Sequence, residues 1–136
     1  MKVLLINPPR TYYSGSEPPA GNLPLSLLHI AAVLEKAGYK TEILDALITD
    51  VSFRKIGDVT EVGMPYGRIM EEIRRRKPDI VGITNPFTCQ VENAVRVANV
   101  VKDIDPSILT VVGGPHVTVV PVEFCHRRSH FLRQEP

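Results

Sequence analysis

The chain has 136 residues, the size of one domain that can hold a hydrophobic core without disulfides or metals. Lysine and arginine number 16 against 15 acidic residues, and this balance favours neither nucleic acid nor an anionic membrane as a partner. Cys89 and Cys125 are too far apart for a C-x-x-C metal knuckle. We interpret them as reduced thiols of a cytoplasmic protein, with a single disulfide as the alternative.

The first apolar run, residues 2–6, is too short to cross a membrane and predicts a strand. It ends at Asn7-Pro8-Pro9, because proline cannot donate to a strand ladder. Residues 10–23 contain glycine, proline and tyrosine without any period. We expect a long loop there, and loops of this length often carry function.

A helix is predicted to begin near Pro24, with Asn22 as its N-cap, and to end at Gly38. Its apolar residues are not confined to one stripe, so we expect it to be covered more widely than a surface helix. Residues 40–45 alternate polar and apolar and predict an outer strand. Residues 47–64 show no clean period and no hairpin signal, and we expect at most a helical turn within them.

Residues 65–77 carry helical periodicity up to Pro78 and end in a basic run, which we interpret as a solvated helix C-terminus. Apolar strands are predicted at 79–84 and 108–112, both buried on two faces. Between them an apolar stripe predicts a helix capped by Thr88 and ending near residue 104. Strands alternating with helices predict an α/β fold with a parallel sheet and right-handed crossovers.

The C-terminal residues 122–136 are basic, poor in apolar residues, and typical of neither helix nor strand. We therefore divide the chain into an α/β domain, residues 1–121, and an irregular basic tail, residues 122–136. The predicted architecture is a three-layer open sheet of flavodoxin-like (Rossmann-like) type with four clear strands and a fifth that is missing or degenerate. An uncovered strand at 108–112 would be an edge, so we expect either the tail to cover it or self-association through it.

In such a sheet, ligands bind beyond the carboxyl ends of the strands, where neighbouring strands lead off in opposite directions. Three loops meet there, and they supply the candidate site residues Asn7, Pro8, Pro9, Thr84, Asn85, Pro86, Gly113, Gly114, Pro115 and His116. A dinucleotide or phosphate loop would need glycines after the first strand, where prolines stand. A phosphate receiver would need acidic residues where Asn7 and Thr84 stand. No nucleophile–base or carboxylate pair appears at the strand ends, which disfavours an independent enzyme.

Four phrases in order, KVLLINPP, LPLSLLHIAAVLEKAGYKTEILDA, PDIVGIT and VVGGPHVT, resemble the N-terminal B12-binding-type domain of many radical S-adenosylmethionine enzymes. That group includes the anaerobic magnesium-protoporphyrin monomethyl ester cyclases, and the resemblance covers residues 2–121. It implies that Thr84, Gly113 and Gly114 line the channel for the nucleotide tail of cobalamin. A hydroxyl can bond such a tail, and glycine lets it approach the backbone.

Two departures limit what the resemblance implies. Many cobalamin enzymes carry D-x-H-x-x-G after the first strand, whose histidine ligates cobalt, and this chain has no histidine in that loop. With two cysteines in all, it also lacks the C-x-x-x-C-x-x-C triad of an iron–sulfur cluster, so we expect no such cluster here.

We therefore expect an accessory domain that holds cobalamin for a radical S-adenosylmethionine catalytic domain or subunit, without activity of its own. The alternative is a cofactor-less interaction or substrate-recognition module that keeps the same fold. For individual residues, the Gly113-Gly114 pair could instead form a tight turn, and His116 could be a surface donor. We expect His29 to be a packed or partly exposed core histidine, and we disfavour a metal cluster of Cys125, His126 and His130.

Overall fold

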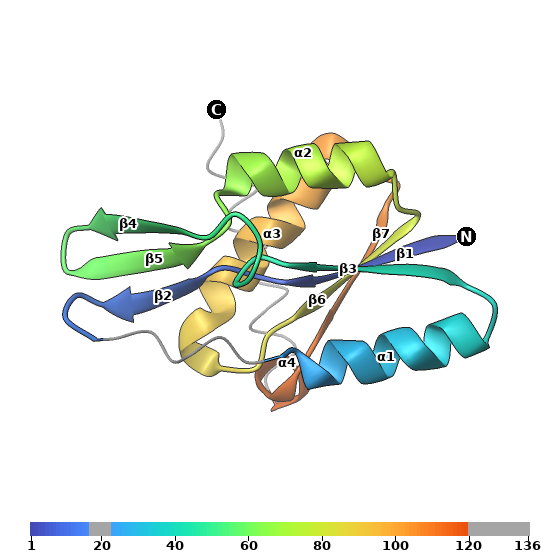
Figure 1. Ribbon diagram of the computed structural model, residues 1–136, viewed down its shortest axis with the longest axis horizontal. Helices are drawn as coiled ribbons and strands as arrows, with labels where there is room; N and C mark the ends of the chain where they lie inside the picture. The colour runs from blue at the N-terminus through green and yellow to red at the C-terminus, as the bar shows by residue number, and fades with distance from the viewer. Residues whose placement is uncertain (17–22, 120–136) are drawn as a thin grey trace.

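The computed structural model describes residues 1–16 and 23–119, and these form a parallel sheet with helices on both faces (Figure 1). The four strands run in the order β3-β1-β6-β7. Their bounds are Lys2–Asn7 (β1), Lys40–Asp45 (β3), Ile80–Thr84 (β6) and Leu109–Gly113 (β7). This order confirms the flavodoxin-like α/β fold with β3 as an outer strand. The predicted cap Asn22, the fifth strand and the basic tail lie outside the described residues.

The two faces of the sheet carry different amounts of core. On one face lie α2 (Tyr66–Arg76) and α3 (Val91–Ile104), and the side chains there form the larger apolar cluster, which includes Leu4 and Ile6. On the other face α1 (Leu25–Lys36) packs on β3 and β1, and the cluster is small: Val3, Leu5, Leu27 and Ala31. Successive residues of a strand point to opposite faces, which is why β1 contributes to both clusters.

A second sheet was not predicted, and here the sequence interpretation is wrong. Strands β2 (Arg10–Tyr13), β5 (Val59–Gly63) and β4 (Ser52–Ile56) form an antiparallel sheet in the order β2-β5-β4, which extends beyond the end of β1 (Figure 1). Ile56 pairs with Val59, so Gly57 and Asp58 form a two-residue turn, with Gly57 at φ 58°. A glycine at the first position of a two-residue turn is a hairpin signature, and the prediction of at most a helical turn in residues 47–64 overlooked it.

Within the described residues β7 is an edge strand, and one of its two faces is exposed, which corrects the prediction of burial on both faces. Leu109 and Val111 are 57% and 51% exposed, whereas Val112 on the opposite face packs against the larger cluster. The expected loop after Gly114 is instead the short helix α4 (Pro115–Val119). On α1 the wider cover expected from sequence is absent within the described residues, where Leu25, Leu28, Ile30 and Val33 are exposed.

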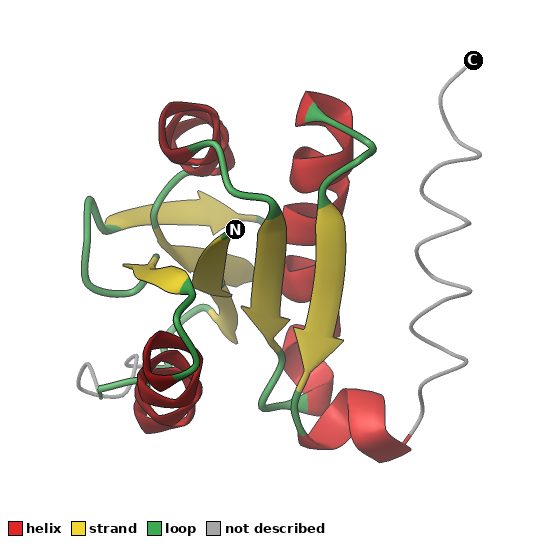
Figure 2. Cartoon of the chain, turned by 90° about the vertical axis from the view of Figure 1, so that its right-hand side faces the viewer, coloured by secondary structure: helices red, strands yellow, loops and turns green. Residues whose placement is uncertain are grey.

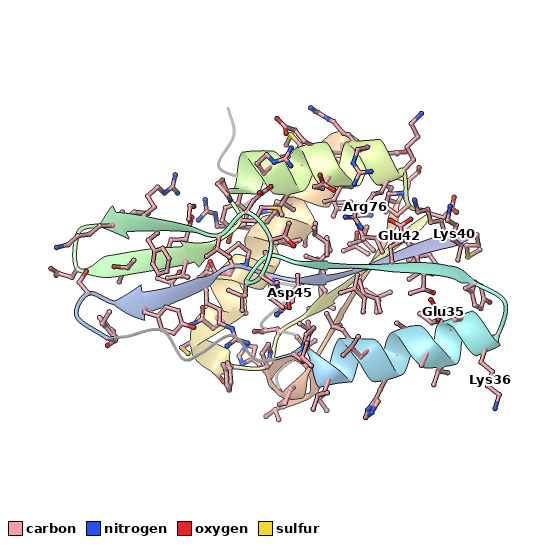
Figure 3. The ribbon with its side chains drawn as sticks, in the orientation of Figure 1. Glu35, Lys36, Lys40, Glu42, Asp45 and Arg76 are labelled. Carbon is pink, nitrogen blue, oxygen red and sulfur yellow. The ribbon has the colours of Figure 1, made fainter. Side chains whose placement is uncertain are left out.

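At the amino-terminal edge of the sheet, four side chains form an ion-pair network: Lys2, Glu42, Glu72 and Arg76. The Lys2 ammonium lies 2.9 Å from the Glu42 carboxylate, and Arg76 reaches both Glu42 (3.1 Å) and Glu72 (3.1 Å). Figure 3 shows Arg76 beside Glu42 on the side of the sheet that carries α2. The hydrogen bond from Lys2 lowers the pKa of Glu42, and bonds from Arg75 and Arg76 lower that of Glu72. The network thus ties α2 to β1 and β3.

None of the helices described in residues 1–16 and 23–119 is long and apolar enough to cross a membrane.

Candidate functional site

The carboxyl ends of β1, β6 and β7 lie at one edge of the parallel sheet, and each is followed by a loop that contains predicted site residues. The backbone N–H of Asn85 donates a hydrogen bond to the backbone carbonyl of Gly113 at 2.8 Å, and this bond holds the loops after β6 and β7 together. Two separate hollows open at this edge. Thr84 and Pro86 contribute to both, the other candidate residues except His116 divide between them, and His116 lines neither.

The larger hollow is an apolar groove of about 580 Å³ between α1 and the strands β6 and β7. It exists because α1 covers only the β3 and β1 half of its face; Figure 2 shows α3 behind the other two strands and no described helix in front of them. Its lining combines strand, helix and loop residues: Val3, Leu5, Ser26, Leu27, Ile30, Leu34, Ile80, Gly82, Ile83, Thr84, Pro86, Val111, Gly113, Gly114 and Pro115. The volume lies within the usual range for small-molecule sites.

The two glycines after β7 differ in what a side chain would meet. A Cβ added at Gly113 has no heavy atom within 4 Å, so its position opens on free space beside the groove. A Cβ at Gly114 would lie 2.3 Å from the Asn85 carbonyl oxygen, and Gly114 also has a φ of 129°. Gly114 is therefore required by the packing of two backbones, whereas Gly113 leaves the end of the groove open.

Most residues that line the groove were missed by sequence reasoning, including Gly82 and Ser26. Gly82 lies between Ile80 and Thr84 on the same face of β6, and a Cβ there would lie 2.7 Å from Leu5 Cδ2, so the absence of a side chain lets Leu5 pack against β6 at the groove floor. Ser26 lies in the first turn of α1 and is exposed. The alternation Ile80-Gly82-Thr84 carried a signal, because a glycine inside a strand marks a close approach. No comparable signal marked Ser26.

Asn7, Pro8, Pro9 and Asn85 line the second hollow, a cavity of about 10 Å³. Asn85 is 1% exposed, and within the described residues neither Oδ1 nor Nδ2 of its side chain has a hydrogen-bond partner. A cavity of this size holds about one water molecule. The structure thus brings these four residues together below the edge, apart from the groove.

Asp45 at the end of β3 was also missed. Its carboxylate accepts hydrogen bonds from the Asn7 side chain at 3.1 Å and from the Leu47 amide at 2.9 Å. Asn7 and Asp45 are both buried, and Asp45 Oδ2 has no partner among the described residues. Figure 3 shows Asp45 at the end of β3 that faces the second sheet. The hydrogen bond between the two side chains fixes the chain where it leaves β1, so the Asn7 side-chain nitrogen already has a partner within the protein.

His116 lies in α4 and is 6% exposed, which excludes the surface position considered for it. Its Nδ1 is 3.1 Å from the Thr88 hydroxyl, and its Nε2 is buried without a partner in the described part of the chain. Thr88 consequently does not cap α3 as predicted: it begins a 3-10 turn, Thr88–Gln90, that has no side-chain cap. The contact joins the loops that follow β6 and β7.

The second sheet is held beside this edge by α3 and by the 3-10 turn that precedes it. The side chain of Gln90 accepts a hydrogen bond from the backbone N–H of Thr11 and donates one to the Thr11 carbonyl, at 2.9 Å each. Arg96 of α3 forms an ion pair with Glu61 of β5 at 2.8 Å. Above the edge, the Arg10 guanidinium lies 5.2 Å from the ring centre of Phe87. The small sheet is therefore held beside the carboxyl edge of the parallel sheet.

Taken together, the strand order, the groove at the carboxyl edge and its glycine-lined end define a flavodoxin-like ligand-binding domain. Residues 21–132 match the model of the B12 binding domain family. The chain belongs to this family, and the family activity is cobalamin binding.

Three relatives have a described activity or class. A cytidylyl-2-hydroxyethylphosphonate methyltransferase of Streptomyces wedmorensis is 33% identical over 124 residues, 88% of this chain and 23% of the relative. An anaerobic magnesium-protoporphyrin IX monomethyl ester cyclase of Rubrivivax gelatinosus is 35% identical over 120 residues, 87% of this chain and 19% of the relative. An uncharacterized methyltransferase of Pyrococcus horikoshii is 31% identical over 121 residues, 89% and 23% respectively. The chain thus spans about a fifth of the length of these relatives.

Proposed function

We propose that this domain holds cobalamin by laying the nucleotide tail of the cofactor in the groove between α1 and strands β6 and β7. The observation that supports this is the open position at Gly113, because the groove ends there at the edge where the fold binds ligands. The corrin ring would then lie against the loops that carry Pro86 and Pro115.

The chemistry of the groove fits the cofactor's tail. Its walls are aliphatic, which suits the flat aromatic base, and the hydroxyl of Thr84 is available because it makes no hydrogen bond within the described residues. Gly113 leaves room for a flat group at the end of the groove. Cobalamin would supply the organometallic chemistry, and the protein would supply binding and placement.

We further infer that the cofactor is used by a radical S-adenosylmethionine catalytic domain, on the same polypeptide or on a separate subunit. The relatives support this, since two are methyltransferases, one is a cyclase, and each is several times longer than the matched region. The groove is apolar and no acid–base pair lines it, so this domain by itself would have no turnover.

The decisive experiment is a titration of the purified chain with hydroxocobalamin, followed by the visible spectrum of the corrinoid. We expect saturable binding that a Gly113→Leu substitution weakens at least about tenfold, because the added side chain occupies the end of the groove. Gly67→Leu is the matched control: Gly67 lies on α2, on the opposite face, and a Cβ there also meets nothing within 4 Å. A folded protein that binds no cobalamin at tens of micromolar would overturn the proposal.

The second candidate is the cofactor-less interaction module, and one observation favours it. The exposed apolar side chains of α1 and β7, Ile30, Val33, Leu109 and Val111, form a surface that another protein could cover. The same titration separates the two, because an interaction module would bind its partner but not cobalamin.

A further inference from the structure

The groove also carries information on which corrinoid it would take, and this inference rests on the function proposed above. Corrinoids differ in the base that ends the nucleotide tail: a benzimidazole, a phenol or a purine such as adenine. The first two expose few or no polar atoms at their edge, whereas adenine exposes an amino group and several ring nitrogens. A groove that buries the base must either pair these atoms or leave them unsatisfied.

The side chains of the groove offer almost nothing for such pairing. Among the described lining residues only Ser26 and Thr84 have a polar side chain, and Thr84 is the last residue of β6, at the carboxyl edge. The side chains of the other walls are aliphatic and include Leu5, Ile30, Ile80 and Val111. The backbone groups of β6 face β1 and β7, because they are used in the sheet ladder, so they are not free to bond a base.

The position of these walls follows from the alternation along the strands. Ile80, Gly82 and Thr84 share one face of β6, and Val111 and Gly113 share the same face of β7. Their polar or core-facing neighbours, such as Thr110, belong to the other face. The apolar lining is therefore a property of one whole face of the sheet.

We propose that this groove selects corrinoids with an apolar aromatic base, a benzimidazole or a phenol, and discriminates against purine-tailed corrinoids. A buried polar group without a partner costs about 1–3 kcal/mol, which corresponds to about 5- to 150-fold in affinity. Since the groove is open along one side and water can reach part of the base, we expect at least about tenfold weaker binding of the adenine-tailed form.

The test is calorimetric titration of the chain with cobalamin, a cresol-tailed corrinoid, an adenine-tailed corrinoid, and cobinamide, which has no tail base. We expect the cresol-tailed corrinoid, whose base does not have to leave cobalt, to bind at least as tightly as cobalamin, and both to bind more tightly than the last two. A tail base that lies in the groove cannot coordinate cobalt at the same time. Release of the base from cobalt costs more free energy for benzimidazole than for adenine. This cost therefore weakens the expected preference for cobalamin over the adenine-tailed form and cannot be its cause.

Two variants link the preference to the groove wall. Ile30→Gln places an amide in the groove, on a helix where glutamine is well tolerated, and should reduce the ratio of cobalamin to adenine-tailed affinity at least threefold. Val111→Thr does the same from β7 with a smaller group. The matched control is Val33→Gln, because Val33 is exposed on the same helix but does not line the groove.

Equal binding of cobalamin and the adenine-tailed form would overturn the selectivity while leaving cobalamin binding intact. An unchanged ratio in both groove variants would show that any preference arises elsewhere and would also overturn it. Equal binding of cobalamin and cobinamide would place the tail outside the groove, and no binding of any of the four by folded protein would refute the proposed function itself.

Discussion

The adjacent glycines at the end of β7 give the sharpest test of the structure, because the same added methyl group should have opposite effects at the two positions. In Gly114→Ala the new Cβ would lie 2.3 Å from the Asn85 carbonyl oxygen and 2.8 Å from its carbonyl carbon. In addition, alanine would have to adopt a φ of 129°. In Gly113→Ala the new Cβ meets no heavy atom within 4 Å.

The magnitudes follow from these two geometries. A strained backbone costs about 1–3 kcal/mol, and forcing an atom into a packed contact costs about 1–3 kcal/mol more. Gly114→Ala should therefore lower the free energy of unfolding by about 2–6 kcal/mol. Gly113→Ala should stay within about 1 kcal/mol of the parent, on the stabilising side, since glycine loses more chain entropy on folding.

Thermal unfolding followed by circular dichroism measures both effects. A domain of 136 residues has an unfolding entropy that converts 1 kcal/mol into about 3.5 °C of melting temperature. Gly114→Ala should thus melt about 7–20 °C lower, and Gly113→Ala should change by no more than about 3 °C. Equal destabilisation by the two substitutions, or an unchanged Gly114→Ala protein, would refute the close approach of the two backbones.

Further predictions concern other parts of the fold. The ion-pair network holds the pKa values of Glu42 and Glu72 below their ordinary 4.5. Its contribution to the free energy of unfolding is therefore complete above that pH and is lost as the pH falls through the lowered values. Urea titrations should show a loss of no more than about 1 kcal/mol, and none in 1 M salt. Tyr66→Phe removes the 2.9 Å bond from the phenol to buried Asn93 and should cost about 1–2 kcal/mol in the same assay, whereas an unchanged midpoint would show that water replaces it. Gly57→Ala should destabilise the hairpin by about 1 kcal/mol, while Gly57→Asn should be milder because asparagine tolerates positive φ; equal effects would argue against the turn geometry. Within the described residues the outer edge of β7 is unpaired, and we expect either the C-terminal tail or a second copy of the chain to cover it; a strict monomer on light scattering whose β7 edge amides exchange freely with solvent would contradict this.

The main sheet could be predicted because each of its elements carries its own signal. Apolar runs at β1 and β6 end at proline-containing loops, and the stripe from Val91 to Val101 has a clear helical period. These patterns are local, and the rules of strand connection then leave few arrangements. The strand order and the edge at which the three loops gather followed from the sequence for that reason.

The second sheet could not be predicted in the same way, because its stability is not local. Strand β4 is almost wholly exposed, and β2 follows directly after two prolines. What holds these strands is contact with α3, through Arg96 to Glu61, and with the 3-10 turn before α3, through Gln90 to Thr11. The one local signal, Gly57-Asp58 between two strands, is equally typical of a loop.

By itself the sequence determined the alternation of strands and helices, the edge at which the loops gather and the resemblance to a cobalamin-binding family. It could not distinguish Gly113 from Gly114, which are neighbours of the same residue type. The tertiary structure separates them, because the chain folds Asn85 against Gly114 and leaves Gly113 facing an open groove. Likewise the apolar character of that groove depends on how much of the sheet α1 covers, and coverage is decided by packing between distant elements.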